Sequence, residues 1–460
     1  MKKTLTKITT ILLAVIMMIP VFAFSGCAGG NRLDVYMWDY FLDEDIIPLF
    51  EAWYYEETGR TITVHAQTFD TNDDVLRELR AGYRWDVINP SDYMIQKLIT
   101  DNNGNSRIQR LDQERFAEHN VLDKFFGVNG VGDPRIIEAA KYFDDDQLYA
   151  IPYLWGTFGF MYNYDRISSH GRSLFNSWEA FWNPYFNDTD FYMIDSIRDA
   201  YSVAMLYVYR EHLARYQENA RRYAEANDIA YYDDNNPHWQ GYRALLTSLF
   251  REFNETRRQQ AWHVLHQLHN RATFETSDNS MWRIHAGEEG YGKFGFQWAC
   301  NAGHLLVNPD WYPEVSIGYV VPNEGTNLWM DAWIIPTTAR NPVAANMWIY
   351  FNLKQNIAEM NIKFAGAPSG HLAANNGARA HFEALYTAND IMFTRHTHPD
   401  SREQFMEIVF PSEATLRRAA VMSDFGDMEN AMRSMYNSVL IGQAPSGTRP
   451  PVTWTLPAPI

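Results

Sequence analysis

Cysteine is almost absent from this chain, which contains only Cys27 and Cys300 among its 460 residues. If Cys27 is modified, Cys300 has no partner for an intrachain disulfide, and the fold must then be stabilised by its hydrophobic core. The sequence also contains no HExxH motif, no GxSxG motif and no phosphate-binding glycine loop. Because no nucleophile with an adjacent base is visible either, we expect a protein that is not an enzyme and needs no cofactor.

Long hydrophobic runs are confined to the N-terminus. Three lysines precede an uncharged run over 11–19, which is typical of a secretory signal and too short for a spanning helix. The following FSGC stretch resembles a bacterial lipobox, in which the cysteine is acylated and becomes the first mature residue. We therefore predict a signal peptide over 1–26 and a tether over 27–31. Cys27 would then anchor an exported protein to the outer face of the cytoplasmic membrane or in the periplasm. An ordinary signal with an incidental cysteine is the alternative.

Positive charge is scarce as well. The chain has 39 Lys and Arg against 56 Asp and Glu, for a formal net charge of −17. The electrostatic field of such an acidic protein repels nucleic acid and anionic lipid and attracts cations. Aromatic residues, by contrast, are abundant at 15% of the chain. We therefore expect no nucleic-acid partner, and the charge favours a cationic ligand.

Strand and helix patterns alternate after the tether. Strands are predicted over 33–38, 61–66 and 85–88, and helices over 43–57, over 72–80 and after a cap at Ser91 or Asp92. This βαβαβα order predicts a mostly parallel sheet covered by helices, with ligands beyond the carboxyl ends of the strands. A charged helical region over 210–249 follows, interrupted at 233–237, and further helices are predicted over 244–253 and 256–269.

One carboxylate lies inside an apolar run, NLWMDAWIIP at 327–336. Asp331 stands between Trp329 and Trp333, where an unpaired charge is costly. Either it has a structural partner, such as a turn or an arginine, or its partner is a cationic ligand. Tryptophan and tyrosine faces attract alkylammonium groups, and a carboxylate accepts charge-assisted hydrogen bonds from them. A linear polyamine, with ammonium groups joined by methylene spacers, fits both features.

Two groups of histidines and one acidic loop are candidate metal sites. His263, His266 and His269 follow an i,i+3 spacing, which spreads them around a helix so that at best two share a metal. His396 and His398 form a second pair, but no carboxylate completes either group convincingly. The loop at 101–112 resembles a calcium loop only faintly, because serine replaces its glycine. We predict solvated or partly buried histidines, a surface loop and no metal.

Several short motifs resemble those of the spermidine/putrescine-binding proteins of bacterial ABC importers. The similarity runs from about residue 33 to 436, broken mainly after residue 210. The motifs are WDY at 38–40, PSDY at 90–93, IPYLWG at 151–156, SWEAFW at 177–182, DSIRD at 195–199, SDN at 277–279, WMD at 329–331 and GAP at 366–368.

The resemblance implies an α/β protein with the two-lobed periplasmic-binding-protein fold, in which each lobe is a mostly parallel sheet flanked by helices. By this resemblance one lobe holds 31–155 and 330–375, and the other holds 156–329 and 376–460. The ligand lies in the cleft between the lobes, which close around it by hinge motion. The expected protein is a monomer that delivers a polyamine to the permease and ATPase subunits of the importer.

The resemblance also implies a set of ligand contacts. Asp331 matches the acid that binds one ammonium group in the family, and the aromatic and polar residues that surround that acid also have matches in this chain. At the far end, where the family has two carboxylates, Asp199 fits one position and Ser196 replaces the other, so ligand length and identity stay open. Another organic cation or a metal ion is the alternative ligand, and a secreted hydrolase is the less favoured alternative function. The candidate contacts are Trp38, Tyr40, Ser91, Tyr93, Ser196, Asp199, Trp298, Trp329 and Asp331.

Overall fold

The computed structural model describes residues 30–101, 104–187, 190–308, 310–312, 316–388 and 401–443. The signal peptide, Cys27 and most of the tether lie outside the described residues, as do His396 and His398. Across the described ranges no helix combines the length and apolar character needed to cross a membrane.

The first sheet has three parallel strands in the order β2-β1-β3. Its alternation of strands and helices is as predicted, with element ends within a few residues. Thr71 begins one helix with a capping box, and Gly59 and Gly82 end two helices with φ of 68° and 86°, a region that glycine adopts without a steric penalty. The elements are β1 (Arg32–Trp38), α2 (Ile46–Thr58), β2 (Thr63–Phe69), α3 (Asn72–Ala81), β3 (Val87–Ile88) and α4 (Asp92–Thr100).

The second sheet contains the remaining strands, in the order β10-β9-β4-β7-β5-β6, with β8 also paired to β4. Strand β5 runs parallel to β6 and β7, whereas the long β4 runs antiparallel to β7, β8 and β9. The bounds are β4 (Ile151–Asn163), β5 (Phe191–Ile194), β6 (Thr273–Glu275), β7 (Phe294–Trp298), β8 (Ile317–Val320), β9 (Thr326–Trp333) and β10 (Ala419–Ala420).

The other helices cover these sheets. They are η1 (Glu114–His119), α5 (Val121–Phe126), α6 (Pro134–Ala140), α7 (Ser169–Leu174), η2 (Trp178–Trp182), α8 (Ile197–Val208), α9 (Arg210–Asn227), α10 (Pro237–Arg251), α11 (Glu255–His269), α12 (Ser277–Ala286), α13 (Ala299–Val307), α14 (Pro342–Asn352), α15 (Gln355–Ala365), α16 (Leu372–Thr387), α18 (Ser401–Val409), α19 (Glu413–Arg417), η3 (Gly426–Met428) and α20 (Glu429–Leu440). The separate helix predicted from residue 244 is wrong, because Asn236 caps one continuous α10 with Pro237 in its first turn.

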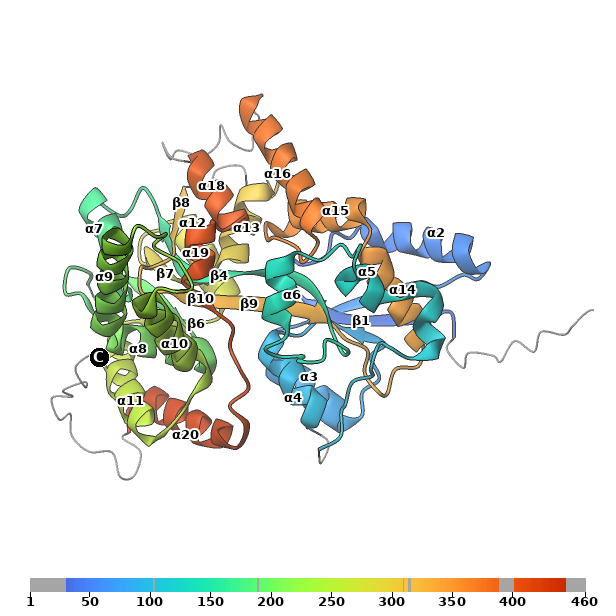
Figure 1. The fold of residues 1–460 in the computed structure, drawn as a ribbon, viewed down its shortest axis with the longest axis horizontal. Coiled ribbons are helices and arrows are strands. Elements are labelled where there is room, and N and C mark those ends of the chain that lie inside the picture. The colour runs from blue at the N-terminus through green and yellow to red at the C-terminus, as the bar shows by residue number, and fades with distance from the viewer. Residues whose placement is uncertain are drawn as a thin grey trace, which may run out of the picture.

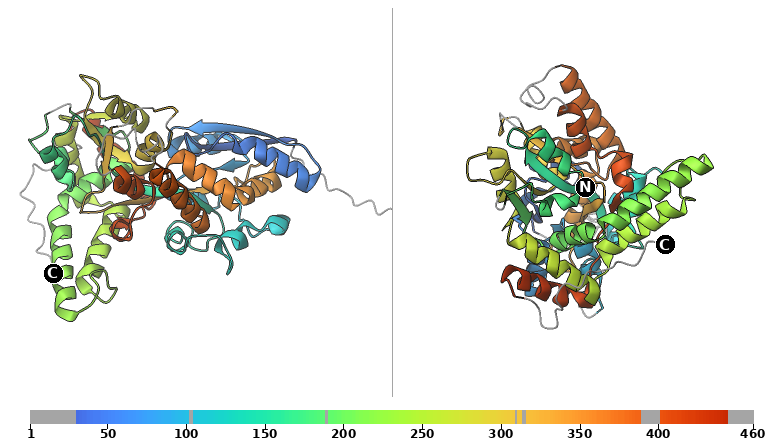
Figure 2. Two further views of the ribbon diagram at one scale, coloured as in Figure 1. Left: turned by 90° about the horizontal axis from the view of Figure 1, so that it is seen from above. Right: turned by 90° about the vertical axis from the view of Figure 1, so that its left-hand side faces the viewer.

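The hydrophobic interior divides into separate cores along the crossing strands. Trp155 near the middle of β4 belongs to the core around β1, whereas Phe158 three residues later belongs to the core around β5 and β7. Figure 1 shows β4 and β9 running between two bodies, one built on β1 and the other carrying α8, α11 and α20. The predicted two-lobed α/β architecture is therefore confirmed. Figure 2 shows that α9 and α10, the charged region, project from the second lobe.

Candidate functional site

A cleft of about 410 Å³ is lined by residues from both lobes. Its wall includes the end of β1, the middle of β9 and the N-terminal ends of α3, α4, α8 and α12. Helix N-termini carry partial positive charge and stabilise carboxylates in the first turn. Asp92, Asp199 and Asp278 occupy such first-turn positions and line the cleft. The helices thus supply an acidic wall.

All nine residues predicted as ligand contacts line this one cleft. They come from distant parts of the chain, since Trp38 ends β1, Trp298 ends β7 and Asp331 lies in β9. Tyr40 follows β1 with a φ of 60°, a left-handed conformation that is uncommon outside glycine and often marks functional sites. Its ring lies 4.6 Å from the imidazole of His304, which also lines the cleft. The structure therefore brings the predicted set together, and its role in binding stays a prediction.

Asp331 is 3% exposed and has no ion-pair partner among the described residues. Its Oδ1 atom accepts no hydrogen bond from them. Burial raises the pKa of this carboxyl to about 7, and the nearby Ser91 hydroxyl and Trp38 indole offset part of the rise. No arginine pairs with Asp331 among the described residues, so the ion pair expected under the alternative interpretation is not found there.

The Trp329 indole is held in place on the same strand. Its Nε1 donates to the carbonyl of Thr157 at 3.0 Å, and its ring packs directly over Gly156. A Cβ atom at Gly156 would come within 2.6 Å of Trp329 Cζ2, so a glycine is needed for the indole to lie there. The ring of Phe41 stacks near it, with the centroids 6.1 Å apart. Trp329 therefore presents a fixed apolar surface close to Asp331.

A second buried carboxyl in the cleft wall is Asp199. Ser196 Oγ donates to Asp199 Oδ2 at 2.6 Å, and the same hydroxyl accepts from the Asp199 backbone N–H at the start of α8. Burial raises the pKa of Asp199 to about 6, while Ser196, Arg198 and the Trp298 indole lower it. Ser196 is thus an N-cap that also supports the remaining acid. Trp298 also lines the cleft, near Asp199.

Ser91 and Tyr93 are joined to each other through Asn72. The Asn72 amide donates to Ser91 Oγ and to Tyr93 Oη, each at 3.0 Å. Ser91 is the N-cap residue of α4, as predicted, but its side chain forms no hydrogen bond that caps the helix. Asn72 has no distinctive sequence signal, because a helix-starting asparagine is common in any protein.

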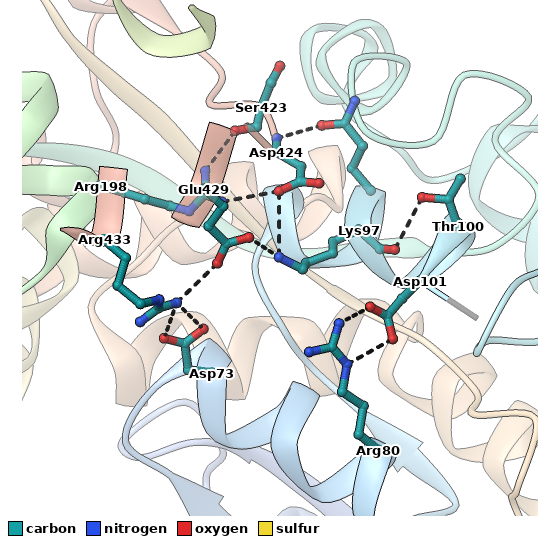
Figure 3. Close-up of polar contacts among 11 residues, drawn as sticks. Asp73, Arg80, Lys97, Thr100, Asp101, Arg198, Ser423, Asp424, Glu429 and Arg433 are labelled. Atoms are coloured by element: carbon teal, nitrogen blue, oxygen red, sulfur yellow. Dashed lines mark hydrogen bonds and ion pairs between the residues drawn. The ribbon is translucent and has the colours of Figure 1, made fainter. Parts of the chain in front are cut away.

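Charged residues connect the lobes beside the cleft, as Figure 3 shows. Lys97 of α4 pairs with Glu429 at the start of α20 and lies 4.0 Å from Asp424. Arg433 of α20 contacts Asp73 of α3 at 3.0 Å. These ion pairs join residues more than 300 positions apart, so the sequence gives no direct sign of them. They hold the two lobes against each other in this conformation.

Metal ligands do not converge in the described ranges, which contain no group of three or more His, Cys, Asp or Glu side chains able to hold a metal ion. His266 stacks on Trp262 with centroids 4.9 Å apart, and His269 packs against Phe274. At the loop that resembles a calcium site, Asp101 pairs with Arg80 and Arg107 instead.

Together the two lobes, the crossing strands and the cleft between them define a solute-binding protein. The model of the bacterial extracellular solute-binding protein family matches residues 50–394, and the chain belongs to that family. Members of this family bind solutes for transport and are not enzymes. This agrees with the prediction made from the sequence, in which we found no catalytic motif.

Two curated relatives are similar to this chain in sequence, and one solved structure is similar to it in fold. The spermidine/putrescine-binding periplasmic protein 1 of Haemophilus influenzae is 22% identical over 381 residues, covering 81% of this chain and 85% of the relative. The spermidine/putrescine-binding periplasmic protein of Escherichia coli is 23% identical over 348 residues, covering 75% and 79%. The TpPotD lipoprotein of Treponema pallidum has a similar fold, with a TM-score of 0.59 at 16% identity over 89% of this chain and 99% of that one.

Proposed function

We propose that this protein captures a linear polyamine, putrescine or spermidine, in its cleft and delivers it to the permease and ATPase subunits of an ABC importer. The observation that carries the proposal is Asp331, a buried carboxyl with an unused oxygen atom beside the fixed indole of Trp329. A buried carboxylate needs a cationic or hydrogen-bonding partner. An ammonium group provides both charge and donors, and the methylene chain beyond it matches the aromatic wall.

The presence of two buried acids in one cleft supports a ligand with more than one charge. Asp331 lies on β9, and Asp199 lies on α8 near Trp298. A diamine or triamine can place one ammonium group at each acid while its spacer crosses the cleft. The curated relatives of this chain are spermidine/putrescine-binding proteins by name, which is consistent with such a ligand.

The proposal also includes the boundaries of the lobes, their closure and the attachment of the protein to the membrane. One lobe comprises 31–155 and 330–375, the other comprises 156–329 and 376–460, and the monomer closes by hinge motion when ligand enters. Acylation of Cys27 tethers the protein to the outer face of the cytoplasmic membrane, where it can meet the permease.

Titration calorimetry with matched amines tests the ligand class. Putrescine, spermidine, the monoamine butylamine and the uncharged 1,4-butanediol differ in the number of ammonium groups on similar carbon chains. We expect binding of the first two, much weaker binding of butylamine and none of the diol. A thermal-shift screen with other organic cations, metals and sugars runs in parallel, because ligand at 100 times its Kd adds about 2.7 kcal/mol of stability. Stabilisation by a metal or a sugar, without a response to either polyamine, would refute the proposal.

A further inference from the structure

A second acid, Asp92, lines the same cleft as the anchor carboxyl of Asp331. Asp92 is the first residue of α4, directly after Ser91, whose backbone pairs with that of Asp331. Its side chain is 1% exposed and lines the cleft. Oδ1 accepts the backbone N–H of Tyr93 at 2.6 Å, whereas Oδ2 is buried and accepts no hydrogen bond from the described residues. Each of the two acids therefore has one unused oxygen in the same wall.

The negative charge of Asp331 acts on the Asp92 carboxyl. Burial raises the pKa of Asp92 well above its usual range, and the charge of Asp331 raises it further. The N–H groups of Tyr93 and Met330 and the charge of Arg198 act in the opposite direction. Two like charges in a buried site are unfavourable, so a proton on one of the two carboxyl groups is favoured over two negative charges.

The cations that face the pair are already committed to other groups. Arg198 on α8 donates to the Ser423 carbonyl at 2.9 Å and to Asp424 at 3.2 Å. Arg251, the last residue of α10, donates to the Val421 carbonyl at 3.2 Å. Neither forms an ion pair with Asp92 or Asp331 in the described part of the chain.

Other titratable groups near the pair do not supply a positive charge. Arg251 also lies over the ring of Tyr142, 3.8 Å from its centroid, which leaves this guanidinium between several partners. Cys300 on α13 faces Asp331, and burial together with that carboxyl raises the pKa of its thiol, which is therefore neutral. Among the described residues, the two carboxyl groups therefore have free acceptor oxygens but no ion-pair partner.

We propose, building on the polyamine-binding function above, that Asp92 and Asp331 form one carboxyl pair that receives a single ammonium group of the ligand and releases one proton to solvent as that group enters. The ammonium group keeps its own protons, and the carboxyl O–H bond is the one that breaks. The second negative charge then balances the incoming positive charge. Asp92 thereby becomes a determinant of affinity that the sequence assigned only to helix capping.

The expected signature is proton release coupled to binding. Because the amine must displace the proton, affinity should rise about tenfold per pH unit below the titration of the pair and level off above it. Calorimetry of putrescine binding in phosphate and in Tris, at pH 7.0 and 8.5, measures the protons released from the difference between the buffers. We expect release of up to one proton per ligand at pH 7.0 and little at pH 8.5.

Three variants assign the proton to its source. Asp92→Asn removes one member of the pair without changing side-chain size, so we expect weaker putrescine binding and less proton release at pH 7.0 than in the wild type, because only Asp331 is left to carry a proton. Asp199→Asn removes the buried acid outside the pair and should retain the release at pH 7.0 despite its weaker binding. Asp331→Asn should abolish the release along with most of the affinity. Thermal unfolding of each variant without ligand checks that it is folded.

The outcomes separate this inference from the function on which it rests. If putrescine binds but releases no proton at pH 7.0, or if Asp92→Asn retains both affinity and proton release, the pair does not exist and Asp92 is a helix residue only. The polyamine function would be unaffected. If no polyamine binds the wild-type protein at either pH, the proposed function itself fails, and the inference fails with it. Should Asp92→Asn not fold, Asp92→Ser removes the same carboxyl with a side chain that is tolerated at a helix start, and its proton count decides the case.

Discussion

The guanidinium of Arg198 lies 4.1 Å from the centre of the Tyr93 ring, so a cation of the protein itself occupies one aromatic face of the cleft. Tyr93 belongs to α4 in the first lobe, and Arg198 belongs to α8 in the second. The same guanidinium also lies 4.9 Å from the centre of the Phe425 ring. Tyr93 therefore contributes to contact between the lobes in addition to any contact with a ligand.

A pair of substitutions at Tyr93 separates its ring from its hydroxyl. Tyr93→Phe keeps the face that Arg198 contacts, and Asn72 keeps its second acceptor on Ser91, so we expect closure and affinity near those of the wild type. Tyr93→Leu removes the cation–π contact, worth about 0.5–2 kcal/mol, and should weaken putrescine binding by a factor of roughly 2–30. Calorimetry and small-angle scattering measure both effects. Equal losses in the two variants would assign the role to the hydroxyl.

Local sequence signals predicted the first lobe well. Alternating apolar residues, capping residues and terminal glycines specify β1 to α4 within short windows, and the structure follows them closely. The nine candidate contacts could also be predicted, because the motifs that carry them resemble a known family. Their common position in one cleft depends on two crossing strands, β4 and β9, whose pairing joins residues more than 150 positions apart.

Other parts of the site had no signal of that kind. Asp92 follows a predicted cap, and a helix-starting acid is explained without any ligand. Lys97 and Glu429 meet only after both lobes have folded, so nothing near either residue indicates the contact. Arg198 was visible in the DSIRD motif, but the ring it contacts lies about a hundred residues earlier. Sequence patterns identify residues with suitable chemistry, whereas tertiary packing decides which of them are already paired.

The ion pair between Lys97 and Glu429 should bias the ligand-free protein toward closure. Both side chains are only about one-sixth exposed, at 15% and 16%, so salt screens them less than a surface pair. Lys97→Met removes the charge and keeps the apolar stem, and we expect a larger radius of gyration without ligand. Putrescine affinity should fall less than tenfold, since Lys97 does not line the cleft.

Arg222→Met is the matched control for the interlobe pair. Arg222 contacts Glu218 at 2.7 Å on the exposed surface of α9, away from the cleft. Small-angle scattering should show no change in its dimensions with or without putrescine. An expansion of this variant similar to that of Lys97→Met would attribute the effect to net charge.

Restoring a carboxylate at residue 196 should change the preferred ligand. Ser196→Asp retains a good N-cap for α8 and places a second acid beside Asp199. Repulsion between the two acids should lower the stability of the ligand-free protein, and a ligand with more ammonium groups offsets that repulsion. We expect the affinity for spermidine to rise relative to that for putrescine. Calorimetry with both amines decides it, with Ser196→Asn as the uncharged control, and an unchanged ratio would contradict the prediction.

The membrane tether can be tested separately from binding. Cys27→Ala should remove the acyl mass from the mature protein and move it from the membrane fraction to the soluble fraction. Cys300→Ala is the control, because it removes the other cysteine, which is buried in the cleft wall. Mass spectrometry and fractionation of cells measure both properties. An unchanged distribution of Cys27→Ala would show that the lipobox interpretation is wrong.

Asp331→Asn should lower the affinity for putrescine and raise the stability of the ligand-free protein. Truncating one member of a buried charge pair typically costs about 2–5 kcal/mol, so the affinity of Asp331→Asn for putrescine should be at least thirtyfold lower than that of the wild type. Trp329→Ala should also weaken putrescine binding, because it removes apolar and cation–π contact. The ligand-free Asp331→Asn variant, however, should be more stable than the wild type at pH 8. The folded protein holds the Asp331 proton until about pH 7, whereas an unfolded aspartate loses it near pH 4, so wild-type stability falls between these values. The advantage of the variant should therefore grow from pH 4 to pH 7 and then stay constant. Thermal unfolding across this range and calorimetry at pH 8 measure the two effects, and a variant that binds putrescine as the wild type does would show that Asp331 is structural.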